Sequence, residues 1–372
     1  MASKYWVGGG SNTNWFGGAT TNWANSSGGA GNQTEPTTGD DVFFDASSGS
    51  GTSVCNTSIS LRSLDCNGYT GTLTHNVSIT ITITGTNASA PSGFPFRLAT
   101  GMTYTLGNST SSAVAFSSTT GTTGISTEGK TLGNVTFTGV GGTWQLNASQ
   151  PFTSSGTVTL TSGTIDSNNE NMTMLAFSST NSNTRAWTPG SSTITITGTT
   201  AVPWNTFTNA GLTFTAGTSS LVVNGDATGA RTMLWHGLTF NNVTISASSP
   251  NANTLSLIAP NTVSNVTIAN LTITNYRNLT TRSNNTLTIS GTFSWTGNTA
   301  SAPGSWSTTT DGNNLASSTT ISVAGATTFN WALLTGLTKA GAGSISAVNC
   351  FDGGNLSGVT VTSPVLTRFV GG

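Results

Sequence analysis

Charged residues are scarce in this chain. Its 372 residues include 10 Lys and Arg and 11 Asp and Glu, so only 6% are charged, against about a quarter in an ordinary soluble domain. A nucleic-acid-binding protein needs a basic patch, whereas the net charge here is −1 and no two basic residues are adjacent. We therefore expect no nucleic-acid partner.

Cysteine, histidine and long apolar runs are also rare. The three cysteines, Cys55, Cys66 and Cys350, make no disulfide framework, although Cys55 and Cys66 could face each other on neighbouring strands. Together with only two histidines they form no metal-ligand set, so we expect no metal and no cofactor. The chain starts without the apolar stretch of a secretory signal and has no run of about 18 apolar residues. We expect neither membrane insertion nor signal-directed export.

Threonine, glycine and branched aliphatic residues fill the chain instead. Threonine accounts for about 75 residues and glycine for 46. Short runs alternate an apolar residue with Thr or Ser, which is the period of a half-buried strand. Residues 77–84 are the clearest case, with Val77, Ile79, Ile81 and Ile83 predicted on one face. No segment of helical period competes, and the pattern predicts an all-β protein.

The strand runs also resemble one another. Residues 132–137, 238–245 and 266–273 share an apolar–Asn–apolar pattern, and strands recur about every 20 to 30 residues. Such a repeat predicts a parallel β-helix (solenoid), in which each coil buries its apolar face against its neighbours and Asn amides form ladders at the corners. The alternative is a pair of tandem β-sandwiches, which would need hairpin turns. We divide the chain into an N-terminal cap or attachment segment (1–50), a β-solenoid (51–326) and a C-terminal closing coil (327–372).

An ordered series of motifs opens the sequence. Trp15 and Asn22-Trp23 are followed by the segment GDDVFF at 39–44 and by the strand-like segments 61–65 and 68–73. The series resembles the opening coils of autotransporter-associated β-strand repeats and of β-helical phage and bacterial surface proteins. The resemblance covers about 75 residues, with a weaker match at 352–355.

The resemblance implies a solenoid at the surface of a cell or a virus. Autotransporter passengers carry a signal and a membrane barrel, and neither is visible in this sequence, which shifts the expectation toward a virion protein made in the host cytoplasm. We expect a capsid decoration, tail fibre or spike that is not an enzyme. Its partners would be itself, as a homo-oligomer and most simply a trimer, together with other virion proteins and a host-surface glycan. The alternatives are a bacterial surface adhesin and a β-helical polysaccharide depolymerase.

Carboxylates are the residues to examine for the depolymerase alternative. Polysaccharide hydrolysis needs two carboxylates that flank the bond, and only Asp40, Asp41 and Asp45 cluster in the sequence. On a regular strand Asp41 and Asp45 would lie about 13 Å apart, which is too far for either mechanism. We expect them to cap turns, and we expect Asp166 and Glu170 to bind backbone amides at a corner.

Aromatic residues give two further expectations. Trp6, Trp15, Trp23, Phe43 and Phe44 lie in a glycine-rich segment that suits a cap packed on the first coil or an attachment surface. Four other tryptophans lie in loop-like contexts and are candidates for stacking a sugar ring, the alternative being burial inside the solenoid: Trp187, Trp204, Trp295 and Trp306.

Overall fold

The computed structural model describes residues 1–108, 110–226, 229–257, 265–282, 285–296, 298–309 and 318–363. The chain divides into two compact units. Unit 1 holds Met1–Ile194 with Ala210–Gly217, and unit 2 holds Thr195–Asn209 with Thr218–Gly372. The division lies inside the segment 51–326 that the sequence assigns to one solenoid, within strand β22 (Thr193–Ile196).

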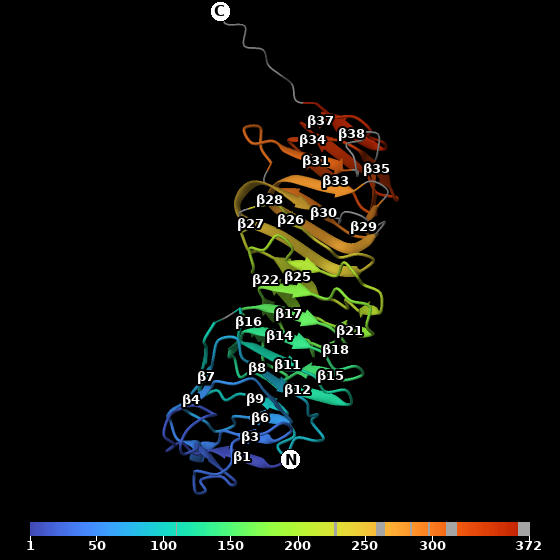
Figure 1. Ribbon diagram of the computed structural model, residues 1–372. Coiled ribbons are helices and arrows are strands. Elements are labelled where there is room, and N and C mark those ends of the chain that lie inside the picture. Colours follow the sequence, from blue (N-terminus) through green and yellow to red (C-terminus); the bar gives the residue numbers. More distant parts are fainter. Residues whose placement is uncertain are drawn as a thin grey trace, which may run out of the picture. The chain divides into compact units, whose positions relative to one another are not determined.

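Three ladders of short strands build unit 1 (Figure 1). The first contains β1 (Ser3–Trp6), β2 (Trp23–Ala24), β3 (Asp41–Phe43), β6 (Ser63–Asp65), β9 (Phe96–Arg97), β12 (Thr122–Ser126), β15 (Thr143–Leu146), β18 (Gly163–Asp166), β21 (Arg185–Thr188) and β24 (Leu212–Phe214). The second contains β5 (Ile59–Leu61), β8 (Thr80–Ile83), β11 (Ala113–Phe116), β14 (Asn134–Phe137), β17 (Thr157–Leu160) and β20 (Ala176–Ser178). The third face carries β4 (Thr52–Cys55), β7 (Thr72–His75) and β10 (Thr103–Leu106), then β13 (Thr131–Leu132), β16 (Phe152–Ser154) and β19 (Met172–Met174).

The chain visits these three faces in a constant order. It runs from β14 to β15 to β16 and then returns to the second ladder as β17, which pairs with β14 in parallel. Val135 lies opposite Val158, and on the first ladder Thr143 lies opposite Thr164. Among the described strands only β1 and β2 pair antiparallel. This parallel register confirms the β-helix and rules out the tandem sandwiches, because sandwiches need antiparallel neighbours.

Unit 2 repeats the arrangement around two long strands. Its strands are β23 (Trp204–Asn205), β25 (Ser220–Val223), β26 (Arg231–Thr232), β27 (Thr239–Ser256), β28 (Val266–Arg282), β29 (Thr286–Ile289), β30 (Phe293–Thr296), β31 (Gly304–Thr309), β32 (Thr319–Val323), β33 (Thr327–Asn330), β34 (Ala332–Leu334), β35 (Leu337–Ala340), β36 (Ile345–Val348), β37 (Phe351–Asp352) and β38 (Val359–Thr362). β27 and β28 run parallel, and successive parts of β28 pair with β29, β30 and β31. The ladders continue as β29–β32–β35, β31–β34–β37 and β33–β36–β38. The predicted closing coil therefore contains β33 to β38, and its last residues, 364–372, lie outside the described ones.

Alternation along each strand builds the interior. In β17 the apolar Val158 and Leu160 are buried, while Thr157 and Thr159 are half-buried on the other face. Equivalent positions stack on neighbouring rungs, so the rings of Phe116 and Phe137 lie 5.4 Å apart and nearly parallel. Because each coil supplies the cover for the next, burial of these columns is the main stabilising contribution.

One predicted strand is shorter than expected. Residues 77–84 were predicted as a single strand with four inward aliphatic residues, but β8 begins at Thr80. Ser78 has a φ of 57°, which ends any strand at that point. Ile81 and Ile83 are fully buried as predicted, whereas Val77 is 49% exposed on the turn and Ile79 is only half-buried.

Asparagine amides hold the corners, as the sequence predicts. Asn134 donates from Nδ2 to the carbonyl of Thr110 on one coil (2.6 Å) and accepts from the amide of Thr157 on the next (2.8 Å). In unit 2 Asn242 and Asn270 lie in register, and Asn270 Nδ2 donates to Asn242 Oδ1 at 2.8 Å. Asn134 thus connects coils at the start of β14 and β17, whereas Asn242 and Asn270 add a side-chain bond to the β27–β28 ladder itself.

Candidate functional site

Charge gathers on the first coils of unit 1. Arg62 forms a two-contact ion pair with Asp41, and its Nε lies 2.9 Å from Asp41 Oδ1. Arg97 pairs with Asp65 through Nε–Oδ1 and Nη2–Oδ2 distances of 2.8 and 2.7 Å. Both carboxylates are almost fully buried, while the arginines reach solvent. These pairs line the first ladder, because Asp41, Asp65 and Arg97 belong to β3, β6 and β9.

The sequence cluster Asp40, Asp41 and Asp45 does not form one site. Asp40 accepts from the amides of Ala2 (2.6 Å) and Thr37 (3.0 Å), and these bonds outweigh the effect of burial and lower the pKa of its carboxyl. Asp45 caps the single-turn 3-10 helix η1 (Ala46–Ser48), because β3 has already ended at Phe43. Two of the three carboxylates therefore cap turns, as expected, and Asp41 is held by Arg62.

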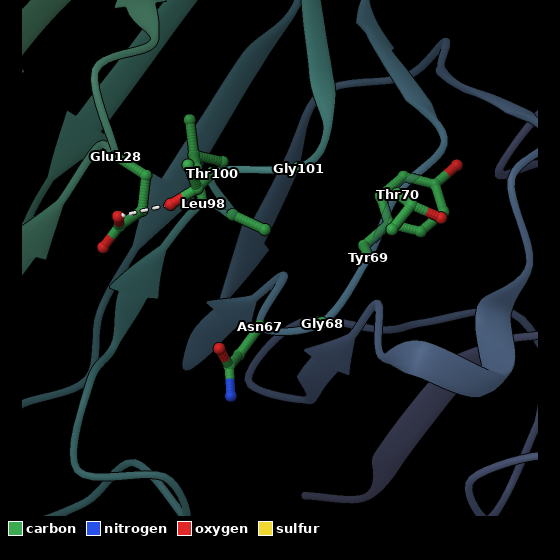
Figure 2. Close-up of a pocket in the computed structure, with 9 residues that line it drawn as sticks. Asn67, Gly68, Tyr69, Thr70, Leu98, Thr100, Gly101 and Glu128 are labelled. Carbon is green, nitrogen blue, oxygen red and sulfur yellow. Dashed lines mark hydrogen bonds between the residues drawn. The ribbon is translucent and has the colours of Figure 1, made fainter.

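A cleft opens beside the Asp65–Arg97 pair, where the corners that follow β6 and β9 meet the corner after β12 (Figure 2). Its volume is about 290 Å³. The lining comprises Asn67, Gly68, Tyr69, Thr70, Leu98, Ala99, Thr100, Gly101 and Glu128. We call it the corner cleft. Figure 2 shows Thr100 and Glu128 on one side and Tyr69 with Thr70 on the other.

Glu128 is the one ionisable carboxylate in this lining. Thr100 Oγ1 donates to its Oε2 at 2.9 Å, Ser126 Oγ donates to its Oε1 at 2.9 Å, and Gln150 Nε2 also donates to Oε1. Burial alone would raise the pKa of Glu128, but these hydrogen bonds and the nearby Arg97 outweigh it and lower the pKa. The carboxylate therefore stays ionised at neutral pH and acts as a hydrogen-bond acceptor.

This arrangement suits binding better than acid–base chemistry. A glycoside hydrolase needs a second carboxylate with a raised pKa across the bond, but the lining holds no second carboxylate, and Asp65 beside it is paired with Arg97. Among the described residues no three His, Cys, Asp or Glu side chains come close enough to share a metal ion. At the corner after β18, Asp166 accepts from the amide of Asn168 and Glu170 from that of Ser149, as the sequence predicts.

The N-terminal aromatic residues form a packed cluster. Trp6, Trp15, Trp23 and Phe44 are each at most 2% exposed, and their ring centroids lie 5.3 to 5.9 Å apart in the pairs that contact. Phe43 points to the other face and stacks on Tyr5 at 4.8 Å. Since β1 and β3 pair with each other and β3 pairs with β6, the cluster is the interior of the first coil. These four rings are therefore covered and do not offer an attachment surface.

The four tryptophans proposed as sugar platforms are also buried, so that prediction is wrong. Trp187, Trp204 and Trp306 are 0% exposed and Trp295 is 4% exposed. They lie in β21, β23, β30 and β31 rather than in loops. Their indole N–H groups donate to acceptors inside the protein, namely Ser167, Thr206, Thr281 and the carbonyl of Tyr276. The flanking Asn, Gly and Thr residues suggested loops, but in a solenoid the same residues surround every short strand.

Both histidines and all three cysteines are buried. His75 is fully buried between the hydroxyl of Tyr104 (2.7 Å) and the carbonyl of Ile79 (2.9 Å). His236 is 5% exposed and packs against the ring of Phe207 at 5.0 Å. Cys55, Cys66 and Cys350 are all buried free thiols, so Cys55 and Cys66 do not pair. Burial raises the pKa of the Cys55 thiol to about 12, which makes it unreactive at neutral pH.

Comparison with known proteins gives no relative for this chain. No family model, no curated protein and no solved structure matches it. Among the described residues there is also no helix with the length and apolarity to span a bilayer.

Proposed function

We propose that this protein is a structural component of a bacteriophage particle, displayed on the capsid exterior or the tail as a decoration, fibre or spike. The observation that carries the proposal is the parallel solenoid with a buried apolar interior and a neutral hydroxyl exterior, seen in strands such as β17, where Val158 and Leu160 are buried and the Thr residues face out. Such a fold is stiff without disulfides or metals, because each coil is fixed by ladders on both sides.

The distribution of charge supports a mechanical role. In the first coils the arginines are paired with buried carboxylates, Arg62 with Asp41 and Arg97 with Asp65. The outer faces are left to Thr, Ser and Asn, which hydrate well but give little long-range attraction. Attachment to the particle would then depend on shape and apolar contact.

An apolar pair in unit 2 supports association through the last coils. Leu333 of β34 lies opposite Phe351 of β37, and both side chains are 45% exposed. Adjacent exposed apolar side chains on neighbouring rungs are suited to burial against another chain. We propose that this surface contacts a second copy of the protein, most simply in a trimer, or another virion protein.

Purified particles provide the test. Virions banded by density and washed in about 1 M NaCl should retain the protein, because screening at that salt removes attraction between exposed charges. Mass spectrometry of the washed particles and gold-labelled antibody in electron micrographs would locate it on the capsid or tail. Loss of the protein in the salt wash would contradict the apolar mode of attachment.

The two rival functions give different outcomes in the same material. Protein found only in the bacterial envelope, and in no particle, would identify a surface adhesin. A depolymerase would release reducing ends from host capsular polysaccharide. Glu128→Gln should then abolish this release while the variant keeps its β-sheet circular dichroism. Either result would overturn the proposed function.

A further inference from the structure

A second cleft lies at the N-terminal end of unit 1, and most of its wall is bare backbone. Its volume is about 430 Å³, within the range of about 300–1,000 Å³ that is typical of small-molecule sites. The lining comprises Trp6, Val7, Gly8, Gly9, Gly10, Asn12, Thr13, Asn22, Ser48, Gly49, Gly51 and Thr52. We call it the glycine cleft.

Glycine keeps this cleft open. At Gly8, Gly9, Gly49 and Gly51 an added Cβ would meet nothing within 4 Å. The first three have φ of 68°, 79° and 71°, a backbone conformation that side chains disfavour. Gly51 carries no such strain, so its lack of a side chain leaves space in the cleft without being needed for the turn.

The loop that lines the cleft is held in place by Asn22, itself a lining residue, and by strand β4. The buried amide of Asn22 accepts from the Gly10 amide at 2.8 Å and donates to the carbonyls of Asn12 and Asn14 at 2.9 and 3.0 Å. Val54 of β4 also bonds this loop, donating to the Thr13 carbonyl and accepting from the Trp15 amide. A loop fixed at both places loses little further entropy when a ligand binds.

Trp6 has a donor with no partner. It is only 2% exposed and lies in the wall of the glycine cleft. In the same cluster, Trp15 Nε1 donates to Ser53 at 2.7 Å and Trp23 Nε1 donates to the Trp15 carbonyl at 2.9 Å. Trp6 Nε1 makes no hydrogen bond to the described residues, and it is not among their fully buried unpartnered atoms, so this nitrogen is the part of the ring that reaches the surface. Its N–H is therefore available to an acceptor in the cleft.

The chemistry of the lining selects the ligand. No Lys, Arg, His, Asp or Glu lines the glycine cleft, so neither an anion nor a cation is favoured. Backbone amides, the Trp6 N–H, the Asn12 amide and the Thr13 and Thr52 hydroxyls offer both donors and acceptors, while the half-buried Val7 gives a small apolar surface. A ligand with many neutral hydroxyls and one apolar face matches this combination.

We propose that the glycine cleft binds a neutral sugar residue, with the Trp6 N–H and the surrounding backbone as the polar contacts. The inference goes beyond the structural role proposed above. It depends on the cleft alone, and it is the same for a virion protein and for a cell-surface protein.

Binding of simple glycosides to the full-length protein tests the proposal. The probes are the methyl glycosides of glucose, galactose, mannose and N-acetylglucosamine, measured by saturation-transfer NMR. We expect at least one to bind with a dissociation constant of about 1 mM, as a single small site would give. Gly51→Val, which extends a side chain into open space at the wall, should weaken that binding at least tenfold.

Two further variants separate binding from folding. Trp6→Phe keeps an aromatic ring in the buried cluster but removes the N–H, and it should weaken binding by about five- to tenfold, the effect of one neutral hydrogen bond. Gly229→Val is the matched control in unit 2, because Gly229 is also an unstrained glycine with open space around its Cβ, and it should bind as the wild type does.

Several results would overturn the proposal. They are the absence of binding by all four glycosides at about 10 mM, unchanged binding in Gly51→Val, or a preference for sialyllactose over the neutral sugars. Binding of short neutral peptides in place of the glycosides would assign the cleft to a protein partner and would equally contradict it.

Discussion

Asp65 and Arg97 lie opposite each other on the adjacent strands β6 and β9, and the Arg97 guanidinium donates to both carboxylate oxygens of Asp65 at 2.8 and 2.7 Å. The Asp65 side chain is 5% exposed and that of Arg97 is 22% exposed. Arg97 also lies over the Phe94 ring, with 5.3 Å between its guanidinium carbon and the ring centroid. In a chain with so few charges, this pair connects two coils at the edge of the corner cleft.

Removing the arginine should destabilise unit 1. Arg97→Ala leaves the buried Asp65 carboxylate without its cation, and we expect a loss of about 2–3 kcal/mol, below the usual value for a fully buried pair because Arg97 is partly hydrated. Urea unfolding followed by circular dichroism measures the loss. Adding Asp65→Asn should restore about half of it, since no charge then remains buried. Lys130→Ala, which removes one exposed hydrogen bond, should change stability by less than about 0.5 kcal/mol. An Arg97→Ala protein as stable as the wild type would show that the pair contributes nothing.

The fold could be predicted from the sequence because a solenoid repeats its signal. Alternation in segments such as 157–160 fixes which residues face inward, and the spacing of the apolar–Asn–apolar units gives the coil length. The early end of the strand at Ser78 could not be predicted in this way. A left-handed residue depends on how the turn before β8 fits the neighbouring coils, and nothing in the alternation of Val77 to Ile83 marks it.

The sites were much less predictable than the fold. Both clefts form where corners from different coils meet, so Glu128 comes close to Asn67 and Tyr69 across about sixty residues of sequence. The wall of the glycine cleft likewise combines residues 6–13 with 48–52. The sequence held one signal of the glycine cleft, the glycine run Gly8-Gly9-Gly10 close to Trp6. This run indicates a cleft only once residues 48–52 are known to lie beside it. Tryptophan by itself gave the wrong answer, because a solenoid interior takes up large rings on every face.

Truncating Trp187, one of the tryptophans first considered as a sugar platform, should destabilise the fold. Trp187 packs on Phe177 with 4.6 Å between ring centroids and donates to Ser167 at 2.9 Å. We expect Trp187→Ala to cost about 3–5 kcal/mol, the usual range for removing a buried aromatic side chain. Thermal unfolding should show a lower midpoint, whereas Val140→Ala, at a position 64% exposed, should leave the midpoint almost unchanged. Wild-type stability in Trp187→Ala would place the indole outside the core.

The asparagine ladder of unit 2 should make a measurable contribution. Asn270 donates to Asn242 at 2.8 Å and accepts from the Thr292 amide at 3.0 Å. Asn270→Ala removes both bonds, and because water can replace the acceptor at the exposed Thr292 amide, we expect a loss of about 1 kcal/mol. Asn241 is the matched control, because its amide makes one long contact of 3.4 Å, and Asn241→Ala should cost less than about 0.5 kcal/mol. Equal losses in the two variants would mean that the ladder adds no specific stability.

His75 should make unit 1 sensitive to acid. The Ile79 carbonyl can only accept, so Nε2 carries the proton and Nδ1 of the neutral ring accepts from the Tyr104 hydroxyl. Burial lowers the pKa of His75 to about 4. Between that value and about 6.5 the unfolded chain binds a proton that the folded one does not, so stability falls as the pH falls through this window.

We expect this histidine alone to remove about 3 kcal/mol of stability between pH 7 and pH 4. Carboxylates with lowered pKa, such as those of Asp40 and Glu128, act in the same direction, so the difference between wild type and His75→Gln isolates the histidine. The urea midpoint of the variant should depend less on pH than that of the wild type, and the His75 ring protons in NMR spectra should titrate near pH 4. Parallel pH profiles for the two proteins would show that His75 is protonated at the same pH in the folded and unfolded states.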